Sequence, residues 1–446
     1  MLSKLKGKQE DLEALLRQKP SGYDRRLLRN VYVLSITMGI MTVFFGWQYY
    51  QSLYLYYGLG ASSLEVGIFF SVASLAHALS GVPASLVSDK HGRKRFVIAG
   101  TFINGFVYMS YAFCGTWFLL MVPLFIQNLV HAAYINPMNA LLAESAPPEK
   151  RGIANGAFQA ISGVISFFAP LIALSIILQF GQDLKNPATL HAGMPELFLL
   201  CGGTVAIMAI ARGLALRETH IRLPSSPKGL HLDETSVGTS IEETSINRKN
   251  QASCDVPGLR SRSTIGFYIF VSIAAVISAV ISYFIPIYGE SVFGFDATQM
   301  ATLFSVSTGV STLVQLPTGR LADSSRKKML LLIAVVLFAL AILLFLKAAD
   351  FNAFVVAQIP FSAAGALLYN TEFTMISCYA RRRNRSTAFS IQTAINDIAS
   401  IPWPLIGGVL FAISPQLPFM FSLVVTVPAF VAGALLVHEP SKPTPE

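Results

Sequence analysis

The residue of this sequence best suited to chemistry in an apolar environment is Asp397. It lies in the largely apolar run 386–413, about ten residues from its start, and so about 15 Å deep if the run is a helix. A carboxylate at this depth is unfavourable unless it faces a polar interior, which makes it a functional candidate by default. Asn396 adjoins it, and Gln392 lies about one and a half turns earlier. We expect these three side chains to form a polar site; the alternative is a carboxylate satisfied by a neighbouring helix.

Glu372 is a second acidic residue inside an apolar run. It lies about seven residues from the end of the run 351–379, and the alternative to a functional role is an ion pair with the arginine cluster 381–385. Glu144 and Arg151 end one run and begin the next. For these two residues an interfacial charge pair is the expected role.

Two histidines lie near the middle of their apolar runs, His77 in the run 63–88 and His131 in the run 117–144. Histidine gains or loses its proton near neutral pH, so either residue could carry a proton. Gln127, His131 and Tyr134 follow one helical face at i, i+4 and i+7, and Asn128 adjoins them. We therefore expect Gln127, Asn128 and His131 to belong to the polar site. A hydrogen-bonded interhelical histidine is the alternative for both, and it is favoured more strongly for His77 than for His131.

Amide and aromatic side chains gather near the end of the run 31–56. Gln48 and Tyr49 lie there, and Tyr283 occupies the matching place in the second half of the chain. Aromatic rings beside amides suit a solute that has both apolar and hydrogen-bonding parts. Ordinary packing of these side chains is the alternative.

The composition identifies the elements that must position these residues. The chain has 446 residues, of which 53% are hydrophobic and 13% are charged. Soluble domains carry about 25% charged residues, so this composition excludes a disordered chain, a secreted disulfide scaffold and most cytosolic enzymes. Apolar runs near 20 residues predict helices that cross a bilayer of about 30 Å. The twelve predicted spans are 31–56, 63–88, 96–114, 117–144, 152–180, 196–216, 264–289, 297–321, 329–346, 351–379, 386–413 and 417–437.

The charges predict the orientation of these spans. The net charge is +9, and nearly all Lys and Arg residues lie in the N-terminal tail or in loops that follow even-numbered spans. Only Lys185 and Lys347 lie on the opposite side. Positively charged loops face the cytosol, so both termini are expected there, in a plasma or inner membrane. The predicted units are a tail at 1–30, a bundle at 31–216, a cytosolic linker at 217–263, a second bundle at 264–437 and a tail at 438–446.

The two halves of the chain repeat each other at an offset of 234 residues without a gap. Asp89 maps onto Asp323, Asn136 maps onto Asn370, and Pro170-Leu171-Ile172 maps onto Pro404-Leu405-Ile406. Because both halves start on the same side of the membrane, the repeat is parallel, about an axis along the membrane normal. Two six-helix bundles related by this axis are therefore predicted.

A short charged motif follows the second span and recurs after the eighth. The first copy runs from Ser85 through Asp89, Gly92, Arg93 and Lys94. The second copy contains Gly319, Asp323, Lys327 and Lys328. A carboxylate at a helix C-terminus is unfavourable unless a cation or a neighbouring helix N-terminus compensates it. A small residue one turn earlier lets another helix approach closely. The motif therefore predicts a tightly packed, charged latch, and a plain positively charged loop is the alternative.

The repeat and the paired motifs together resemble the major facilitator superfamily over about residues 30–438. The resemblance implies an all-α polytopic membrane protein of two six-helix bundles, in which the motif keeps the cytosolic side closed. It also implies secondary active transport of a small solute by rocker-switch alternating access. The drug-antiporter signature is incomplete, because Ala169 replaces its glycine and Gln127 stands where its arginine would be.

The sequence also limits the energy source and the partners. It contains no GxxxxGK[ST] loop and no recognisable enzyme motif, so an ATP-driven pump and an enzyme are not expected. Acidic and histidine side chains at mid-depth favour H⁺ over Na⁺ as the coupling ion, and the absence of mid-depth Lys or Arg favours a neutral or cationic solute. A proton-independent facilitator and a non-transporting sensor with the same fold remain alternatives. We expect a monomer in the lipid bilayer that needs no cofactor or metal and binds no nucleic acid.

Overall fold

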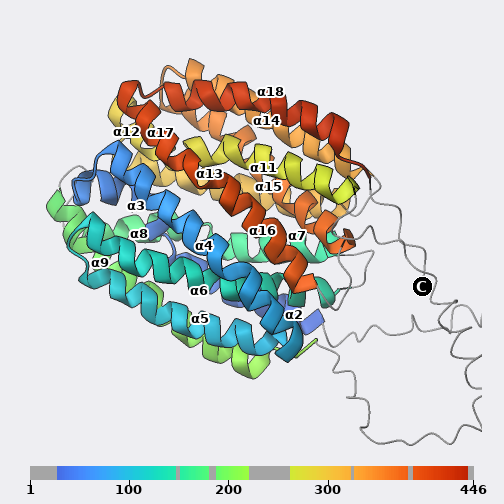
Figure 1. Ribbon diagram of the computed structural model, residues 1–446. Coiled ribbons are helices and arrows are strands. Elements are labelled where there is room, and N and C mark those ends of the chain that lie inside the picture. Colours follow the sequence, from blue (N-terminus) through green and yellow to red (C-terminus); the bar gives the residue numbers. More distant parts are fainter. Residues whose placement is uncertain are drawn as a thin grey trace, which may run out of the picture.

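A computed structural model describes residues 28–146, 151–179, 187–219, 262–322, 326–379 and 385–439, which form helices and short connections without strands. The first half contains α2 (Leu28–Phe44), α3 (Trp47–Leu53), η2 (Tyr54–Gly58), α4 (Ser63–His91), α5 (Arg93–Ser110), η3 (Tyr111–Phe113), α6 (Trp117–Glu144), α7 (Arg151–Ser166), α8 (Ala169–Ile177) and α9 (Pro187–Ala215). The second half contains α11 (Arg262–Ile281), α12 (Ile285–Phe293), α13 (Ala297–Ala322), α14 (Lys327–Lys347), α15 (Phe351–Tyr379), α16 (Arg385–Ser400), α17 (Pro402–Ile413) and α18 (Leu417–Leu436). Figure 1 shows these helices side by side in one elongated bundle.

The prediction of twelve membrane-crossing helices is confirmed. Eleven helical segments in the described ranges are long and apolar enough to cross a membrane. The twelfth is α13, which has 26 residues and is rich in Ser, Thr and Gln. It packs against α7, α8 and α15. Polar side chains of α13 are tolerated where they bond to other helices, as Thr308 does to Tyr49 and Ser307 to Ser362.

Four of the twelve crossings are interrupted, which the sequence analysis did not predict. The second helix of the pairs α7–α8, α11–α12 and α16–α17 has a proline in its first turn. Proline lacks a backbone N–H and clashes with the preceding turn, so it ends one helix and begins another. In the first crossing the interruption lies at Gly46, where an added Cβ would be 2.4 Å from the carbonyl oxygen of Ala169. This close contact between the first and fifth crossings requires glycine.

One predicted helix start differs from the structure by more than three residues. The sixth span was predicted from residue 196, directly after Pro195, whereas α9 begins at Pro187 and continues through Pro195. A proline within a long buried helix is tolerated when neighbouring helices support it.

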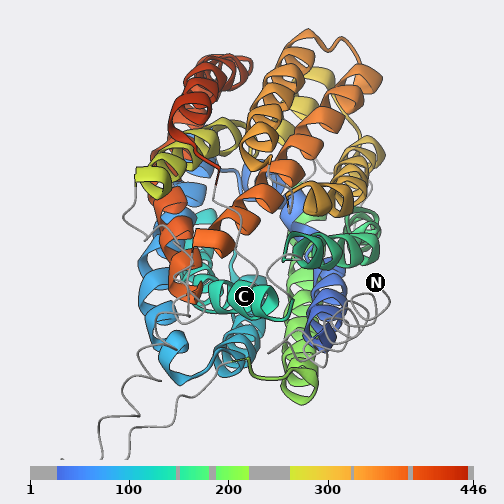
Figure 2. The same ribbon diagram turned by 90° about the vertical axis from the view of Figure 1, so that its right-hand side faces the viewer.

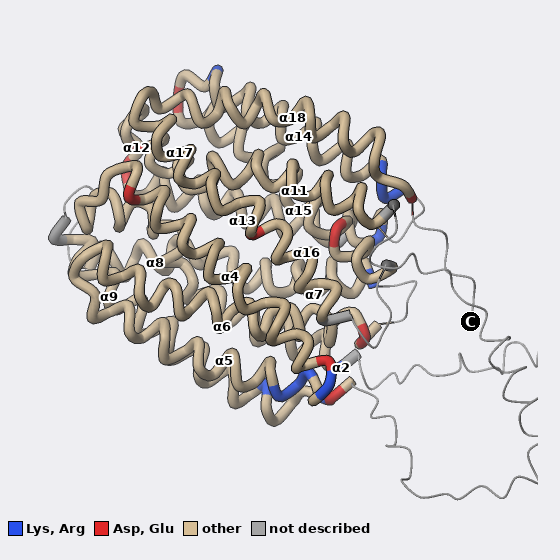
Figure 3. The backbone as a smooth tube through the Cα atoms, in the orientation of Figure 1, with Lys and Arg blue, Asp and Glu red and all other residues tan. Residues whose placement is uncertain are grey.

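The halves of the chain touch mainly through α4 and α7 of the first half. Helix α4 packs against α16 and α17, and α7 packs against α13. Figure 2, turned by 90°, shows the blue-to-green first half and the yellow-to-red second half lying against each other. We call the end at which α4 finishes and α5 begins the basic end, because Figure 3 shows most of the described Lys and Arg residues there.

Contacts between the halves follow the 234-residue offset found in the sequence. The ring of Tyr49 lies 5.1 Å from that of Phe304, and the equivalent pair, Tyr283 and Phe70, stacks at 3.6 Å between centroids. Near the basic end, Gly319 lies against Gly152 and Gly156. The equivalents of Gly319 and Gly156 are Ser85 and Ser390, whose hydroxyls are hydrogen-bonded. Each of these contacts between the halves therefore has an equivalent contact at the positions related by the repeat.

Several sequence predictions fall outside the described residues. They concern Asp323, Lys185, Arg381–Arg383, most of the linker 217–263 and most of the two tails.

Candidate functional site

Three ionisable side chains form a hydrogen-bonded chain at mid-depth. His77 Nδ1 lies 2.5 Å from Asp397 Oδ2, and His77 Nε2 lies 3.2 Å from His131 Nδ1. The side chains of His77 and Asp397 are only 14% and 21% exposed. His77 and His131 lie at the middle of α4 and α6, while Asp397 is in the last turn of α16 before the interruption at Ile401. This chain, which we call the central triad, therefore joins the two halves at their contact.

The hydrogen bonds of His77 define what the central triad can do. When Asp397 is ionised, the ring N–H at Nδ1 of His77 donates to the carboxylate, and Nε2 is free to accept from His131. A proton added to Asp397 or His77 changes these bonds, because protonated histidine has only donors. His77 uses its two ring nitrogens for partners on opposite sides of the ring. A single metal ion could not bind all three side chains in this arrangement.

The central triad has no counterpart in the repeat. Under the 234-residue offset, His77, His131 and Asp397 correspond to Ser311, Gly365 and Gly163. A Cβ added at Gly365 would meet no atom within 4 Å, so there is open space where the second half lacks a histidine. A near-symmetrical scaffold thus carries an asymmetric polar centre.

Glu372 forms a separate acidic contact. It shares no hydrogen bond with the central triad. Its Oε2 accepts a hydrogen bond of 3.0 Å from Gln392 Nε2, so α15 and α16 are linked here. The structure thus pairs Gln392 with Glu372, whereas the sequence analysis expected it beside Asp397. Asn396 Oδ1 is buried and has no hydrogen-bond partner among the described residues. Tyr369, one turn before Glu372, is 40% exposed, so this region of α15 borders accessible space.

The amides predicted on α6 do not reach the central triad. Gln127 Nε2 donates to the hydroxyl of Tyr108 on α5, at 3.2 Å. Asn128 Nδ2 donates to the side chain of Gln127 and to the carbonyl of Leu124. Of the predicted α6 residues, the structure places only His131 at the polar centre. Gln127 links α6 to α5, and Asn128, among the described residues, bonds only within α6.

The aromatic residues predicted for the site lie at the contact between the halves. Tyr49 hydrogen-bonds to Thr308 of α13 at 2.8 Å, and Tyr283 stacks on Phe70 of α4. Gln48 is exposed, and no side-chain hydrogen bond joins it to the described part of the protein. Tyr49 and Tyr283 therefore hold the two halves in contact. These contacts lie between the central triad and the end opposite the basic end.

At the basic end, Asp89 is the centre of a buried ion cluster. It accepts hydrogen bonds from Arg93 Nη2 at 2.9 Å and from the backbone N–H and hydroxyl of Thr387 at 2.9 and 2.7 Å. Arg93 also forms an ion pair with Glu144. Asp89 is thus compensated both by a cation and by the N-terminus of α16. We call Asp89, Arg93, Glu144 and Thr387 the basic-end cluster.

The expected pairing of the interfacial charges needs a correction. The structure pairs Glu144 with Arg93, whereas Arg151 donates to the carbonyl of Ser377 on α15 at 3.1 Å. The sequence places Glu144 and Arg151 close along the chain. The helix packing instead brings the start of α5 to the end of α6.

Two glutamates cap the helices that follow the charged motifs. Gly92 adopts φ +100°, a conformation that favours glycine, and reverses the chain between α4 and α5. Glu218 then accepts from the backbone N–H groups of Arg93 and Lys94 at 3.2 and 3.1 Å. In the second half, Glu439 accepts from the N–H groups of Lys327 and Lys328 at 3.2 and 2.8 Å.

The sequence did not point to these two glutamates or to Arg212, and it did not predict the partners of His77. Glu218 and Glu439 each lie three residues after the end of a sixth crossing, at Ala215 and Leu436, and that shared spacing was the available signal. His77 was ranked below His131, yet it is the residue that connects the central triad. Arg212 was not selected, although its buried guanidinium donates to the hydroxyls of Thr37 and Thr101, both at 2.9 Å.

Comparisons with known proteins agree on one family. The model described as Major Facilitator Superfamily matches residues 33–324 and 293–446. An uncharacterized MFS-type transporter of Methanocaldococcus jannaschii is 29% identical over 33% of this chain and 39% of its own length. The quinolone resistance protein NorA of Staphylococcus aureus is 23% identical over 40% of this chain and 44% of its own length. The alignments thus span about two fifths of these relatives.

A solved structure shares the fold along nearly the whole chain. The crystal structure of the human organic anion transporter MFSD10 (TETRAN) superimposes with a TM-score of 0.67. The match covers 92% of this chain and 100% of the other, at 13% sequence identity. This likeness establishes the arrangement of the helices.

Proposed function

This chain belongs to the major facilitator superfamily and is an integral, multi-pass membrane transporter rather than an enzyme. We propose that it moves a small organic solute by proton-coupled alternating access. The observation that carries the proposal is the contact of His77 with Asp397, at mid-depth and across the two halves.

The reciprocal contacts between the halves support alternating access. Near the basic end the halves meet at Gly319 and Gly156 and at Ser85 and Ser390. Towards the other end they meet through the rings of Tyr49, Phe304, Phe70 and Tyr283. If the two bundles rock about the central triad, one set of contacts separates while the other stays closed. Both sets of contacts are formed in this structure, as they would be in an occluded step of the proposed cycle.

The central triad supports proton coupling because its one carboxylate belongs to the second half and both histidines belong to the first. A proton on Asp397 neutralises the carboxylate and weakens its attraction to His77 across the interface. Protonation therefore changes how strongly the halves are held at mid-depth. A solute that binds beside Asp397 would experience the same change, and the two events would be linked.

We propose a neutral or cationic organic solute. Asp397 and Glu372 are acidic, and among the described residues their side-chain partners are histidine and glutamine rather than lysine or arginine. One relative is named for quinolone resistance, and the structural neighbour is named as an organic anion transporter. Their names are compatible with this class of solute, and the charge of the central triad favours its neutral or cationic members.

The test is transport in proteoliposomes by the Asp397→Asn variant. Asparagine keeps the size of the side chain and can hydrogen-bond to His77, but it cannot titrate. We expect the variant to bind solute and exchange it across the membrane, while uphill accumulation under an imposed pH gradient falls to a concentration ratio near one. Glu196→Gln is the matched control, because Glu196 is exposed on α9 and has no described partner.

Accumulation at the wild-type level in Asp397→Asn would remove the coupling assignment and make Glu372→Gln the next variant to measure. If the wild-type protein itself equilibrates solute without responding to the pH gradient, it is a facilitator. Solute binding without flux in the wild type would identify a sensor.

A further inference from the structure

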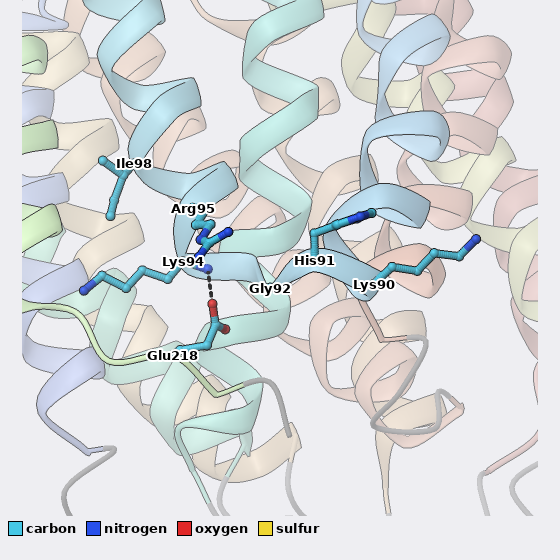
Figure 4. A pocket seen from close by; sticks show the side chains of 7 residues that line it. All are labelled: Lys90, His91, Gly92, Lys94, Arg95, Ile98 and Glu218. Atoms are coloured by element: carbon cyan, nitrogen blue, oxygen red, sulfur yellow. Dashed lines mark hydrogen bonds between the residues drawn. The ribbon is translucent and has the colours of Figure 1, made fainter. Parts of the chain in front are cut away.

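A charged cavity lies at the basic end, apart from the central triad and from the contact between the halves. It has a volume of about 450 Å³ and surrounds the turn between α4 and α5. The side chains that define it are Lys90, His91, Lys94, Arg95, Ile98 and Glu218. Figure 4 shows Lys90 and Lys94 directed to opposite sides of this cavity, with His91, Arg95 and Glu218 between them.

The positive charge of the cavity is not neutralised within the described part of the protein. Lys90, Lys94 and Arg95 form no side-chain hydrogen bond or ion pair there, and Glu218 is the single acidic side chain of the lining. Three cations against one carboxylate leave an excess of two positive charges, even with His91 neutral. Arg93 does not contribute, because it is buried and bound to Asp89 and Glu144.

Glu218 shows that this place holds an oxyanion. Its two carboxylate oxygens each accept a backbone N–H at the start of α5, from Arg93 and Lys94. A helix N-terminus favours negative charge through these unpaired N–H groups. Glu218 satisfies the N–H groups but leaves the surrounding side-chain cations free for a second anion.

An apolar surface continues from the cavity along α5. Arg95, Phe102 and Phe106 follow one face of this helix, at i, i+7 and i+11, and Ile98 lies at the cavity itself. Phe102 is 40% exposed, Ile103 is 50% exposed and Phe106 is 55% exposed. In a membrane protein, such a row beside a cationic end matches a lipid, whose acyl chain follows the apolar face and whose headgroup lies at the interface.

We propose that this cavity binds the phosphate headgroup of an anionic phospholipid, with an acyl chain along Phe102 and Phe106. The long side chains of Lys94 and Arg95 contact the phosphate, and Lys90 adds positive charge on the far side of the turn. The bound lipid rests on the turn at Gly92, next to the basic-end cluster.

The test measures lipid binding to the purified full-length protein by native mass spectrometry. The probes are phosphatidylglycerol and phosphatidylcholine with identical acyl chains. Because each basic residue near an anionic lipid surface contributes about 1 kcal/mol, we expect the variant Lys94→Gln/Arg95→Gln to bind phosphatidylglycerol about tenfold or more weakly than the wild type. The control Arg29→Gln/Lys347→Gln removes the same charge from exposed sites outside the cavity and should bind as the wild type does.

A second variant acts in the opposite direction. Glu218→Gln removes the one negative charge of the lining, so phosphatidylglycerol should bind more tightly. Equal preference for phosphatidylglycerol in the double variant and its control would overturn the proposal, as would weaker binding by a Glu218→Gln protein that melts like the wild type. Displacement of the lipid by an equal concentration of glycerol 3-phosphate would identify a site for soluble phosphates and reject the lipid.

Discussion

His77 is the residue through which the first half of the protein contacts the acidic centre of the second. Its ring touches Asp397 with one nitrogen and His131 with the other. A histidine held in this way can pass a change of protonation from one neighbour to the next, because each nitrogen acts as a donor or an acceptor according to the other. We therefore assign to His77 a role as central as that of Asp397.

We predict that His77→Gln loses coupling while keeping the fold. Glutamine can still hydrogen-bond to Asp397, but it cannot carry a proton. In proteoliposomes, the pH-driven accumulation ratio should fall to near one, with exchange at equal pH retained. His191→Gln is the control, since His191 is exposed at the start of α9. Normal accumulation in His77→Gln would assign the coupling to Asp397 without its histidine partner.

Residue type and depth in the sequence were sufficient to select Asp397, Glu372 and His131 as candidates. They were insufficient to predict partners, because the contact of His77 with Asp397 joins positions 320 residues apart. The same limit explains Gln127, which shares a helical face with His131 but bonds to Tyr108. The rotation of a helix about its axis depends on its neighbours, and the composition of a single helix does not determine it.

Between the two halves, α13 approaches α7 closely near the basic end. A Cβ added at Gly319 would lie 2.4 Å from the carbonyl oxygen of Gly152 and 3.1 Å from the Cα of Gly156. Backbone lies directly opposite, so there is no flexible side chain that could move aside. The two helices can pack in this way only because these positions have no side chain.

We predict that Gly319→Ala disfavours closure at the basic end. The added methyl group overlaps backbone, and overpacking of this kind costs about 1–3 kcal/mol. Thermal melting should show a lower midpoint, and cysteines placed on facing surfaces of α7 and α13 should react faster with a water-soluble maleimide. Gly213→Ala is the matched control, because its Cβ would meet only the side chain of Ile98 at 3.8 Å. Equal effects in the two variants would show that helix propensity alone is responsible.

The sequence predicted the ends of most helices but none of their interruptions. Long apolar runs define a membrane crossing whether or not it bends, so the runs that contain Pro170, Pro286 and Pro402 were each assigned to one helix. Pro83 and Pro123 lie inside continuous helices. The outcome at each proline depends on the helices packed around it, which a single sequence does not display.

For the whole molecule, the two-fold repeat accounts for contacts at both ends and leaves the centre asymmetric. The offset of 234 residues, read from the sequence, relates Tyr49 and Phe304 to Tyr283 and Phe70 in space. The sequence thus predicted the symmetry of the scaffold. It did not predict the caps supplied by Glu218 and Glu439, because these two glutamates are not related by the 234-residue offset.

We predict that Asp89→Asn opens the basic end while the opposite end stays closed. The variant removes the charge that binds Arg93 and the start of α16, and hydrogen bonds to charged groups contribute about 1.5–3 kcal/mol, so the equilibrium should shift about tenfold or more. Spin labels at Leu214 and Leu435 report one end of the bundle, and labels at Phe113 and Ile413 report the other. All four positions are exposed.

The distance between the first pair of labels should lengthen and that between the second should stay short. A substitution at the exposed carboxylate Glu196, to glutamine, serves as the control. Unaltered distance distributions at both ends in Asp89→Asn would show that the basic-end cluster has no influence on the position of the halves.

The depth of the central triad has an electrical consequence. His77 lies midway along the 29 residues of α4, so a proton that reaches the central triad from either side crosses roughly half of the bilayer. A charge that crosses the full membrane gains or loses about 2.3 kcal/mol per 100 mV, so each half of the journey carries about 1.2 kcal/mol. Proton entry from one side and release to the other are then both sensitive to voltage. With a neutral solute, transport should generate a current in liposomes on a solid-supported electrode, and Asp397→Asn should abolish that current while leaving solute exchange intact.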